Sequence, residues 1–214
     1  MEISAQNYLI AGTLLCGYVI GSIPFAVIIS RMNGVNILKV NSGNPGATNV
    51  RRSVGKWAGN TVFILDFLKG FIPTALVQYV FLSKYKDFTT NLNLVLIGGL
   101  ILGHNFSIFL KFRGGKGIAT TMGGLLAIMP GCFGIGILTW LVIFKATRFV
   151  SLASISFVVS LPLTSYLFGY SNKAIIFCIV LMVIAILKHK SNIKRLWEGT
   201  EYRFSKNNRE DHDI

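Results

Sequence analysis

The sequence predicts an all-α integral membrane protein with a single domain, residues 1–214, and three observations support this fold class. First, 52% of the residues are hydrophobic and only 14% are charged, whereas a soluble domain carries about 25% charged residues. Second, the apolar residues form runs close to the ~20 residues that a helix needs to cross a bilayer. Third, these runs are continuous and do not alternate as the strands of a membrane β-barrel do. The polar end, residues 205–214, is expected to be a mobile tail.

The candidate spans are six apolar runs at residues 8–29, 57–82, 92–110, 118–144, 149–168 and 174–187. The fourth run contains Met129, Pro130 and Gly131 near its middle. Proline and glycine there are compatible either with a kink in one span or with a turn between two short spans. No basic segment precedes the first run, so we expect this run to be retained as a span and not cleaved as a signal peptide.

The distribution of Lys and Arg separates these alternatives, because cytoplasmic loops are enriched in both residues. If residues 118–144 crossed once, Lys145, Arg148 and the basic tail would lie opposite the basic loops 30–56 and 111–117. With a turn at Pro130, all four basic segments lie inside. The sequence therefore predicts seven transmembrane helices, two of them short spans around Pro130, with the N-terminus outside and the C-terminus cytoplasmic. The net charge of +13 then reflects topology and not binding of nucleic acid.

A polar loop at residues 42–52 is the strongest functional feature. It combines small hydrogen-bonding residues with glycines, which let a ligand approach backbone N–H groups closely. Arg51 and Arg52 follow and supply positive charge suited to phosphate. The alternative is an ordinary polar turn, but such a turn seldom needs so many consecutive turn-type residues. We therefore expect this loop to bind phosphate.

A second candidate is the loop at residues 111–117, where three glycines surround Lys116. The nucleotide-binding phosphate loop is excluded, because Leu110 stands at its first glycine position and Gly117 at its Ser/Thr position. A lysine on a glycine-rich turn at a helix start can still neutralise a phosphate. A basic loop that only sets topology is the alternative. His104, shortly before this loop, is expected to be a packed or interfacial histidine and not a ligand.

A third candidate follows the last span. His189 lies at its end and is suited to act as a base or hydrogen-bond donor; Asn192 and Glu201 come next. The alternative is a basic membrane anchor, which needs none of these three side chains. Ser151 and Ser154 share one helical face, and both substrate binding and helix packing remain open for them.

Polar residues inside the spans are interpreted structurally. Asp66 and Lys69 are three residues apart on a helix, so they are expected to form an ion pair. Gly21 and Pro24 indicate a kink in the first span with close helix packing. The cysteines, which are expected to be small buried side chains without disulfides, are Cys16, Cys132 and Cys178. No cofactor and no metal site are expected.

In their order along the chain, these motifs resemble the bacterial acyl-phosphate-dependent glycerol-3-phosphate acyltransferases, and the resemblance covers nearly the whole chain. It rests on residues 21–24, 42–52, 66–70, 103–117, 151–154 and 189–201. Ser107 stands where the family usually has Pro, Lys190 where it has Arg, and Ala26 where Gly is common. The His-x4-Asp motif of another acyltransferase group is absent.

The resemblance implies an activity: transfer of a fatty acyl group from acyl phosphate to the 1-hydroxyl of glycerol 3-phosphate. The products are lysophosphatidic acid and inorganic phosphate, and the reaction is the first acylation step of phospholipid synthesis. It also implies a multi-pass protein of the bacterial inner membrane with its active site on the cytoplasmic face. The partners implied are the two substrates, the lipid bilayer and, by functional coupling, the enzyme that makes acyl phosphate.

The resemblance assigns residue roles as well. The catalytic residues would be Ser42, Arg52, Lys116 and His189, and the substrate-binding residues Gly43, Asn44, Gly46, Thr48, Asn49, Gly115, Ser154 and Asn192. The first loop would hold the acyl-phosphate phosphate, while Arg52 and Lys116 would grip glycerol 3-phosphate. The proton acceptor is either His189 or a substrate phosphate.

Two rival functions remain: a phosphate-ester transporter and a structural membrane subunit. Transporters often carry paired broken spans, whereas the break at Pro130 has no clear partner in the other half of this chain. A structural subunit would not need the glycine-rich loops.

Overall fold

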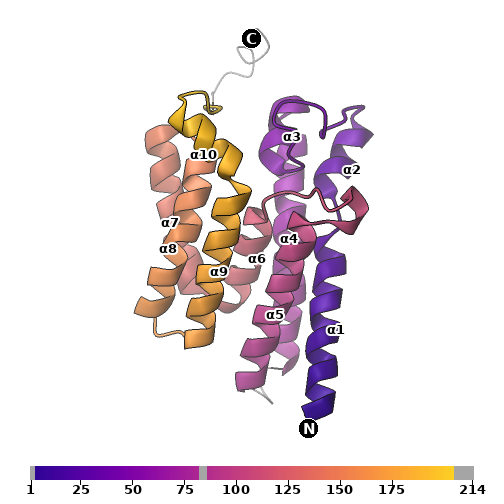
Figure 1. Cartoon of the computed structure of the whole chain (residues 1–214), viewed down its shortest axis with the longest axis vertical. Coiled ribbons are helices and arrows are strands. Elements are labelled where there is room, and N and C mark those ends of the chain that lie inside the picture. The colour runs from indigo at the N-terminus through magenta and orange to yellow at the C-terminus, as the bar shows by residue number, and fades with distance from the viewer. Residues whose placement is uncertain (1–2, 82–85, 205–214) are drawn as a thin grey trace. The chain divides into compact units, whose positions relative to one another are not determined.

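The structure, a computed structural model, describes residues 3–81 and 86–204, and in this part of the chain the only regular elements are helices (Figure 1). The chain divides into two compact units, Met1–Pro130 and Gly131–Ile214. The predicted mobile tail, 205–214, lies outside the described residues. Whether the two units form one domain stays a prediction.

The first unit contains α1 (Ile3–Gly21), α2 (Phe25–Met32), α3 (Ala47–Ser53), α4 (Lys56–Phe81), α5 (Lys86–Asn105), the 3-10 turn η1 (Ile108–Leu110) and α6 (Ile118–Ile128). In this unit α1 packs along α5, and α4 packs against α3, α5 and α6. Figure 1 shows α2 and α3 at the end of the unit away from the N-terminus of α1. The loop 42–52 joins these two helices, and Gly115 of the loop 111–117 lies beside its Pro45.

Glycines make the crossing of α1 and α5 possible. Gly17 and Gly21 are four residues apart on α1, and Gly99 and Gly103 are four apart on α5. A Cβ on Gly99 would lie 2.5 Å from the Leu14 carbonyl oxygen, and one on Gly103 would overlap the α1 backbone. Paired small residues at this spacing let membrane helices approach closely. The Tyr18 hydroxyl also donates a hydrogen bond to the Phe106 carbonyl, 2.8 Å away.

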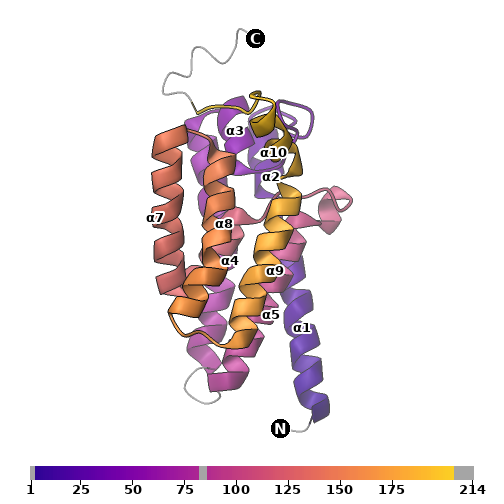
Figure 2. The same cartoon turned by 60° about the vertical axis from the view of Figure 1, so that its left-hand side comes forward.

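The second unit contains α7 (Pro130–Thr147, which starts at the unit boundary), α8 (Val150–Leu167), α9 (Asn172–Lys188) and α10 (Lys190–Trp197). Both views show α8 and α9 side by side, with α10 following α9 (Figure 2). Phe157 of α8 is fully buried, and its ring occupies the space beside Gly136 of α7. Buried residues of α9 recur at helical spacing along one face, namely Ala174, Cys178, Leu181 and Ala185.

Five helical segments of the described chain are long and apolar enough to span a membrane: Ala5–Met32, Lys56–Val80, Asn91–Leu110, Pro130–Thr147 and Val150–Leu167. A sixth is formed by α9 and α10 if these helices, bent by 60° at His189, count as one span. The prediction of a helical membrane protein is thus confirmed. The seventh predicted span corresponds to α6, whose 11 residues extend only ~16 Å. Seven crossings and their orientation stay predictions.

The helix break at Pro130 is confirmed, because α6 ends at Ile128 and α7 begins at Pro130. Proline is favoured at a first helical position, where its missing N–H costs no hydrogen bond. The expectation that both spans around Pro130 are short needs a correction. Only α6 is short, since α7 has 18 residues and continues to Thr147.

Candidate functional site

The loop between α2 and α3 is held by buried residues on both sides of the glycine-rich stretch. Ile37 and Val50 pack in an apolar cluster with Val62 of α4. The Asn49 amide nitrogen donates hydrogen bonds to the carbonyls of Ile37 and Val40, both at 3.2 Å. Asn49 is only 2% exposed, so the contacts of this predicted substrate-binding residue are with the loop that it supports.

Within this loop, the predicted phosphate-binding residues are accessible. Ser42 is exposed, and Gly43, Asn44, Gly46 and Thr48 are half-buried. The Ser42 hydroxyl accepts a hydrogen bond from the Asn44 N–H at 3.4 Å. Gly43 has φ +63°, a left-handed conformation that favours glycine. The backbone of this stretch is therefore shaped by local hydrogen bonds and a glycine turn.

The two arginines after the loop differ in their surroundings. Arg51 lies against Gly59 of α4, and its guanidinium donates a hydrogen bond to the Asn60 side-chain oxygen at 3.2 Å. Arg51 thus ties α3 to α4. Arg52, the residue predicted to bind substrate, is half-buried at the end of α3.

The second loop is folded back on the end of α5. The N–H of Gly114 donates to the Asn105 carbonyl at 3.2 Å, and the N–H of Gly115 donates to the His104 carbonyl at 3.0 Å. A Cβ on Gly115 would overlap the His104 ring and would lie 3.1 Å from the Pro45 carbonyl oxygen. Gly115 therefore lies directly against the first loop. Lys116, the next residue, is half-buried.

Ser107, which stands where the family usually has Pro, has a structural role at the break between α1 and α2. The Ser107 hydroxyl is buried and donates a hydrogen bond to the Ser22 carbonyl at 2.6 Å. Ser22 lies just after the end of α1, where carbonyl groups lose their helical partners. Serine at position 107 supplies a donor there that proline does not have.

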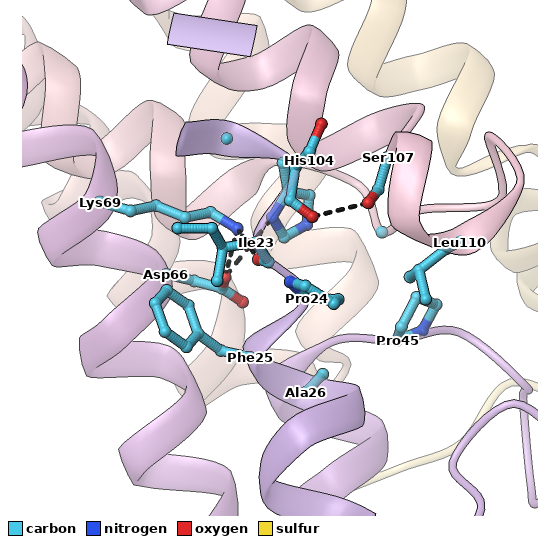
Figure 3. Close-up of a pocket in the computed structure, with 13 residues that line it drawn as sticks. Ile23, Pro24, Phe25, Ala26, Pro45, Asp66, Lys69, His104, Ser107 and Leu110 are labelled. Atoms are coloured by element: carbon cyan, nitrogen blue, oxygen red, sulfur yellow. Dashed lines mark hydrogen bonds and ion pairs between the residues drawn. The ribbon is translucent and has the colours of Figure 1, made fainter. Parts of the chain in front are cut away.

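A buried ionic cluster lies between α4, α5 and this break (Figure 3). The Asp66 carboxylate is 2.7 Å from the Lys69 ammonium, as predicted for an i,i+3 ion pair. The same carboxylate oxygen is 3.6 Å from Nδ1 of His104. Lys69 also donates a hydrogen bond to the Ile23 carbonyl at 3.2 Å. These residues line a small pocket together with Ser22, Pro45 and Gly115. His104 is buried as expected, but its pairing with Asp66 had no sequence signal.

In the second unit, Glu201 is the centre of a polar network that the sequence interpretation left without a role. One carboxylate oxygen accepts hydrogen bonds from the Ser151 hydroxyl and the Asn192 amide, each at 2.7 Å. The other accepts from Arg195 Nε at 2.7 Å. Burial alone would raise the pKa of Glu201, but these three hydrogen bonds and the Arg195 charge hold its pKa below the ordinary 4.5. Glu201 is therefore ionised at neutral pH and fixes Asn192.

His189 lies at the bend between α9 and α10 and is 2% exposed. Its Nδ1 is 2.7 Å from the Ala185 carbonyl oxygen. A carbonyl only accepts hydrogen bonds, so Nδ1 carries the proton and the neutral ring has its lone pair on Nε2. This tautomer is the one that a general base acting through Nε2 requires.

The Ser154 hydroxyl donates to the Val150 carbonyl of its own helix, α8, at 2.8 Å and accepts from the Trp140 indole of α7 at 3.4 Å. Helix packing thus accounts for the contacts that Ser154 makes. Ser151, in contrast, is part of the Glu201 network. The connection after α7 and the start of the tail lie together, because the Phe204 N–H donates to the Arg148 carbonyl at 2.9 Å.

The predicted site residues fall into two sets. In the first unit, the loops at residues 42–52 and 114–117 meet where Gly115 lies against Pro45. In the second unit, the segments 151–154 and 189–201 meet through the hydrogen bonds of Ser151 and Asn192 to Glu201, whereas Ser154 contacts Val150 and Trp140. Across the described residues, no group of three or more His, Cys, Asp or Glu side chains is arranged to hold a metal ion.

Comparison with known proteins gives the same family in three ways. The model of the glycerol-3-phosphate acyltransferase family matches residues 11–199. A glycerol-3-phosphate acyltransferase of Endomicrobium trichonymphae is 43% identical over 189 residues, which cover 88% of this chain and 92% of the relative. One of Aquifex aeolicus (strain VF5) is 41% identical over 193 residues, covering 89% and 97%.

Two crystal structures of PlsY, an integral membrane glycerol 3-phosphate acyltransferase, are also similar. The glycerol 3-phosphate form has a TM-score of 0.83 and 39% identity, and the alignment covers 92% of this chain and 96% of PlsY. The lysophosphatidic acid form has a TM-score of 0.81 and 38% identity, with coverage of 92% and 95%. This chain therefore belongs to the glycerol-3-phosphate acyltransferase family.

Proposed function

We propose that this protein transfers a fatty acyl group from acyl phosphate to the 1-hydroxyl of glycerol 3-phosphate, releasing lysophosphatidic acid and inorganic phosphate. The acceptor and the product of this reaction are the molecules after which the two crystal forms of the related PlsY are named, the glycerol 3-phosphate form and the lysophosphatidic acid form. The observation that carries the proposal is the contact of the two glycine-rich loops, where Gly115 lies against Pro45. Two phosphate-binding segments side by side are what a reaction between two phosphorylated substrates needs.

Electrostatics explains why this arrangement suits the reaction. Both substrates are anions, and two unit charges about 5 Å apart repel each other by ~3 kcal/mol at an effective dielectric constant of 20. Backbone N–H groups and the Ser42 hydroxyl would hold the acyl-phosphate phosphate. Arg52 and Lys116 would bind glycerol 3-phosphate and offset the repulsion. Holding both phosphates in this way would place the substrate hydroxyl against the reactive carbonyl, which accelerates the reaction.

The acyl phosphate is a mixed anhydride, so no covalent enzyme intermediate is required. The 1-hydroxyl oxygen attacks the acyl carbonyl carbon and forms the ester bond. The bond between that carbon and the phosphate oxygen then breaks, and phosphate leaves with the electron pair. The hydroxyl proton passes either to Nε2 of His189 or to a substrate phosphate. The Nδ1 hydrogen bond of His189 to Ala185 supports the first route.

In the second unit, His189, Asn192 and Ser154 are the residues that the family resemblance assigns to the reaction. Asn192 is oriented by its hydrogen bond to Glu201, so Glu201 would act on the reaction only through Asn192. The Ser154 hydroxyl contacts Val150 and Trp140. Its proposed role in substrate binding rests on the family resemblance.

We also propose a topology of seven spans with the N-terminus outside and the site on the cytoplasmic face of the bacterial inner membrane. The support is the distribution of Lys and Arg. The enzyme would receive acyl phosphate from the enzyme that makes it. A variant with Cys16, Cys132 and Cys178 replaced by Ala and one cysteine introduced after Phe204 tests the orientation, when it is labelled in sealed right-side-out and inside-out vesicles. Labelling from the outer side would refute it.

One assay tests the activity. Detergent-purified protein is incubated with palmitoyl phosphate and glycerol 3-phosphate, and both inorganic phosphate and lysophosphatidic acid are measured. We expect equal amounts of the two products, and no lysophosphatidic acid when glycerol replaces glycerol 3-phosphate. Detergent removes every sealed compartment, so product formation would also exclude a transporter. Acylation from palmitoyl-CoA but not from palmitoyl phosphate would refute the donor and leave the acyltransferase activity intact.

A further inference from the structure

The pairing of Asp66 with His104 has no part in the proposed reaction, yet it joins the helices of the first unit to both phosphate-binding loops (Figure 3). Asp66 comes from α4 and His104 from the end of α5. Pro45, from the first loop, lines the same pocket. The role of the pair follows from the contacts at its two ends.

At the Asp66 end, both the side chain and the main chain of Asp66 are held. Lys69 approaches it to 2.7 Å and is itself held by the Ile23 carbonyl, 3.2 Å away. The main-chain carbonyl of Asp66 accepts a hydrogen bond from the Thr120 hydroxyl of α6 at 3.1 Å. The Asp66 and Lys69 side chains are each only 4% exposed. Asp66 is therefore a rigid partner for the imidazole of His104.

At the other end, His104 contacts the backbone that precedes Lys116. Its main-chain carbonyl accepts the Gly115 N–H at 3.0 Å, and Nε2 of its ring occupies the space where a Cβ of Gly115 would lie. That same absent Cβ would be 3.1 Å from the Pro45 carbonyl oxygen. Gly115 is thus enclosed between the imidazole and the first loop.

We propose that His104 is a positioning residue: Asp66 fixes the imidazole, and the imidazole fixes Gly115 against Pro45. The pair would thereby set the spacing between the loop that carries Lys116 and the loop at residues 42–49. This inference rests on the proposed function, because the spacing of the loops sets the distance between the two substrate phosphates. Displacing the reacting groups by about 1 Å lowers the reaction rate roughly a hundredfold.

Two substitutions that compensate each other test the proposal. In His104→Asn, the amide keeps a donor near the Nδ1 position, but the ring edge that contacts Gly115 is removed. We expect kcat/KM for glycerol 3-phosphate to fall at least tenfold. In Gly115→Ala, the new Cβ overlaps the ring, and we expect an equal or larger loss. In the double variant the Cβ occupies the space that the ring leaves, so kcat/KM should rise at least tenfold above that of Gly115→Ala.

A matched control separates positioning from simple destabilisation. Asn93 is buried on the same helix, about 16 Å from His104 along its axis, and donates a hydrogen bond to the Gln78 side chain at 2.6 Å. Asn93→Leu should lower the thermal midpoint and leave KM for both substrates unchanged. The proposal is wrong if the two losses of kcat/KM multiply in the double variant. It is also wrong if His104→Asn leaves KM and kcat unchanged.

A binding measurement keeps this test separate from the test of the proposed function. The rise in thermal midpoint with added glycerol 3-phosphate should disappear in each single variant and return in the double variant. Wild-type protein that is stabilised by glycerol 3-phosphate but inactive with palmitoyl phosphate would refute the proposed donor only. Active wild-type protein whose single variants keep both activity and stabilisation would refute the positioning role only.

Discussion

Replacing Glu201 by glutamine tests whether its network holds the end of the second unit together. The carboxylate accepts from Ser151 and Asn192 on one oxygen and from Arg195 on the other, and its side chain is 3% exposed. Glutamine has the same shape but only one acceptor oxygen. If that oxygen keeps the first two partners, the new amide group faces the Arg195 Nε–H, and two donors oppose each other.

The expected magnitude follows from that lost bond. A hydrogen bond to a charged group contributes about 1.5–3 kcal/mol. Arg195 is 25% exposed and can turn partly to water, so we expect a loss near 2 kcal/mol. For a chain of this size, 1 kcal/mol shifts the thermal midpoint by roughly 2–4 °C. Glu201→Gln should therefore melt about 4–8 °C below the wild type in a detergent thermal-unfolding assay.

Glu198→Gln provides the matched control. Glu198 pairs with Lys194 at 3.7 Å, but the two side chains are 47% and 75% exposed. An exposed i,i+4 pair of this kind contributes only about 0.3–0.5 kcal/mol, so the midpoint should change by less than about 2 °C. Equal midpoints for Glu201→Gln and Glu198→Gln would refute the reasoning.

Three further predictions concern pH, substrate binding and helix packing. Folding lowers the pKa of Glu201, so the ionised side chain stabilises the folded protein fully above pH 4.5, and this stabilisation is lost as the pH falls through the lowered pKa. The thermal midpoints of the wild type and of Glu201→Gln should therefore converge in acid. Arg52→Ala and Lys116→Ala should each raise KM for glycerol 3-phosphate roughly 10–100-fold, as loss of a charge-assisted contact implies, whereas Arg51→Ala should raise it by less than about threefold. Full activity of both variants at low substrate would contradict the two-phosphate arrangement. Gly103→Val should prevent the close crossing of α1 and α5, so folded protein should be lost in size-exclusion chromatography; a monodisperse, active variant would contradict this packing.

Features of the fold that depend on neighbouring residues could be predicted from the sequence. The apolar runs locate the spans, and the run at 8–29 corresponds to the helical segment Ala5–Met32. Pro130 ends a helix because its ring and missing N–H prevent continuation. The ion pair of Asp66 and Lys69 follows from i,i+3 spacing. The length of α6 could not be predicted, because hydrophobicity continues past its end at Ile128 without a change.

The candidate site was predictable only as separate pieces. Glycine and arginine indicated the loop at 42–52, but nothing local shows that Asn49 turns inward to bind the carbonyls of Ile37 and Val40. The role of Glu201 depends on Ser151, fifty residues earlier. The contact of His104 with Asp66 likewise joins two helices. Side-chain orientation and contacts between distant segments are tertiary properties, which spacing along one segment does not encode.

The break between α1 and α2 has a consequence for the order of membrane insertion. Its carbonyls at Ser22 and Ile23 are satisfied by Ser107 and Lys69, which are synthesised 85 and 46 residues later. Backbone groups without partners are not tolerated in the hydrocarbon region. When the first segment enters the bilayer, it must either remain a continuous helix or keep residues 22–24 in contact with water. Within the hydrocarbon region, the bent form of this segment therefore requires α4 and α5 to have joined it.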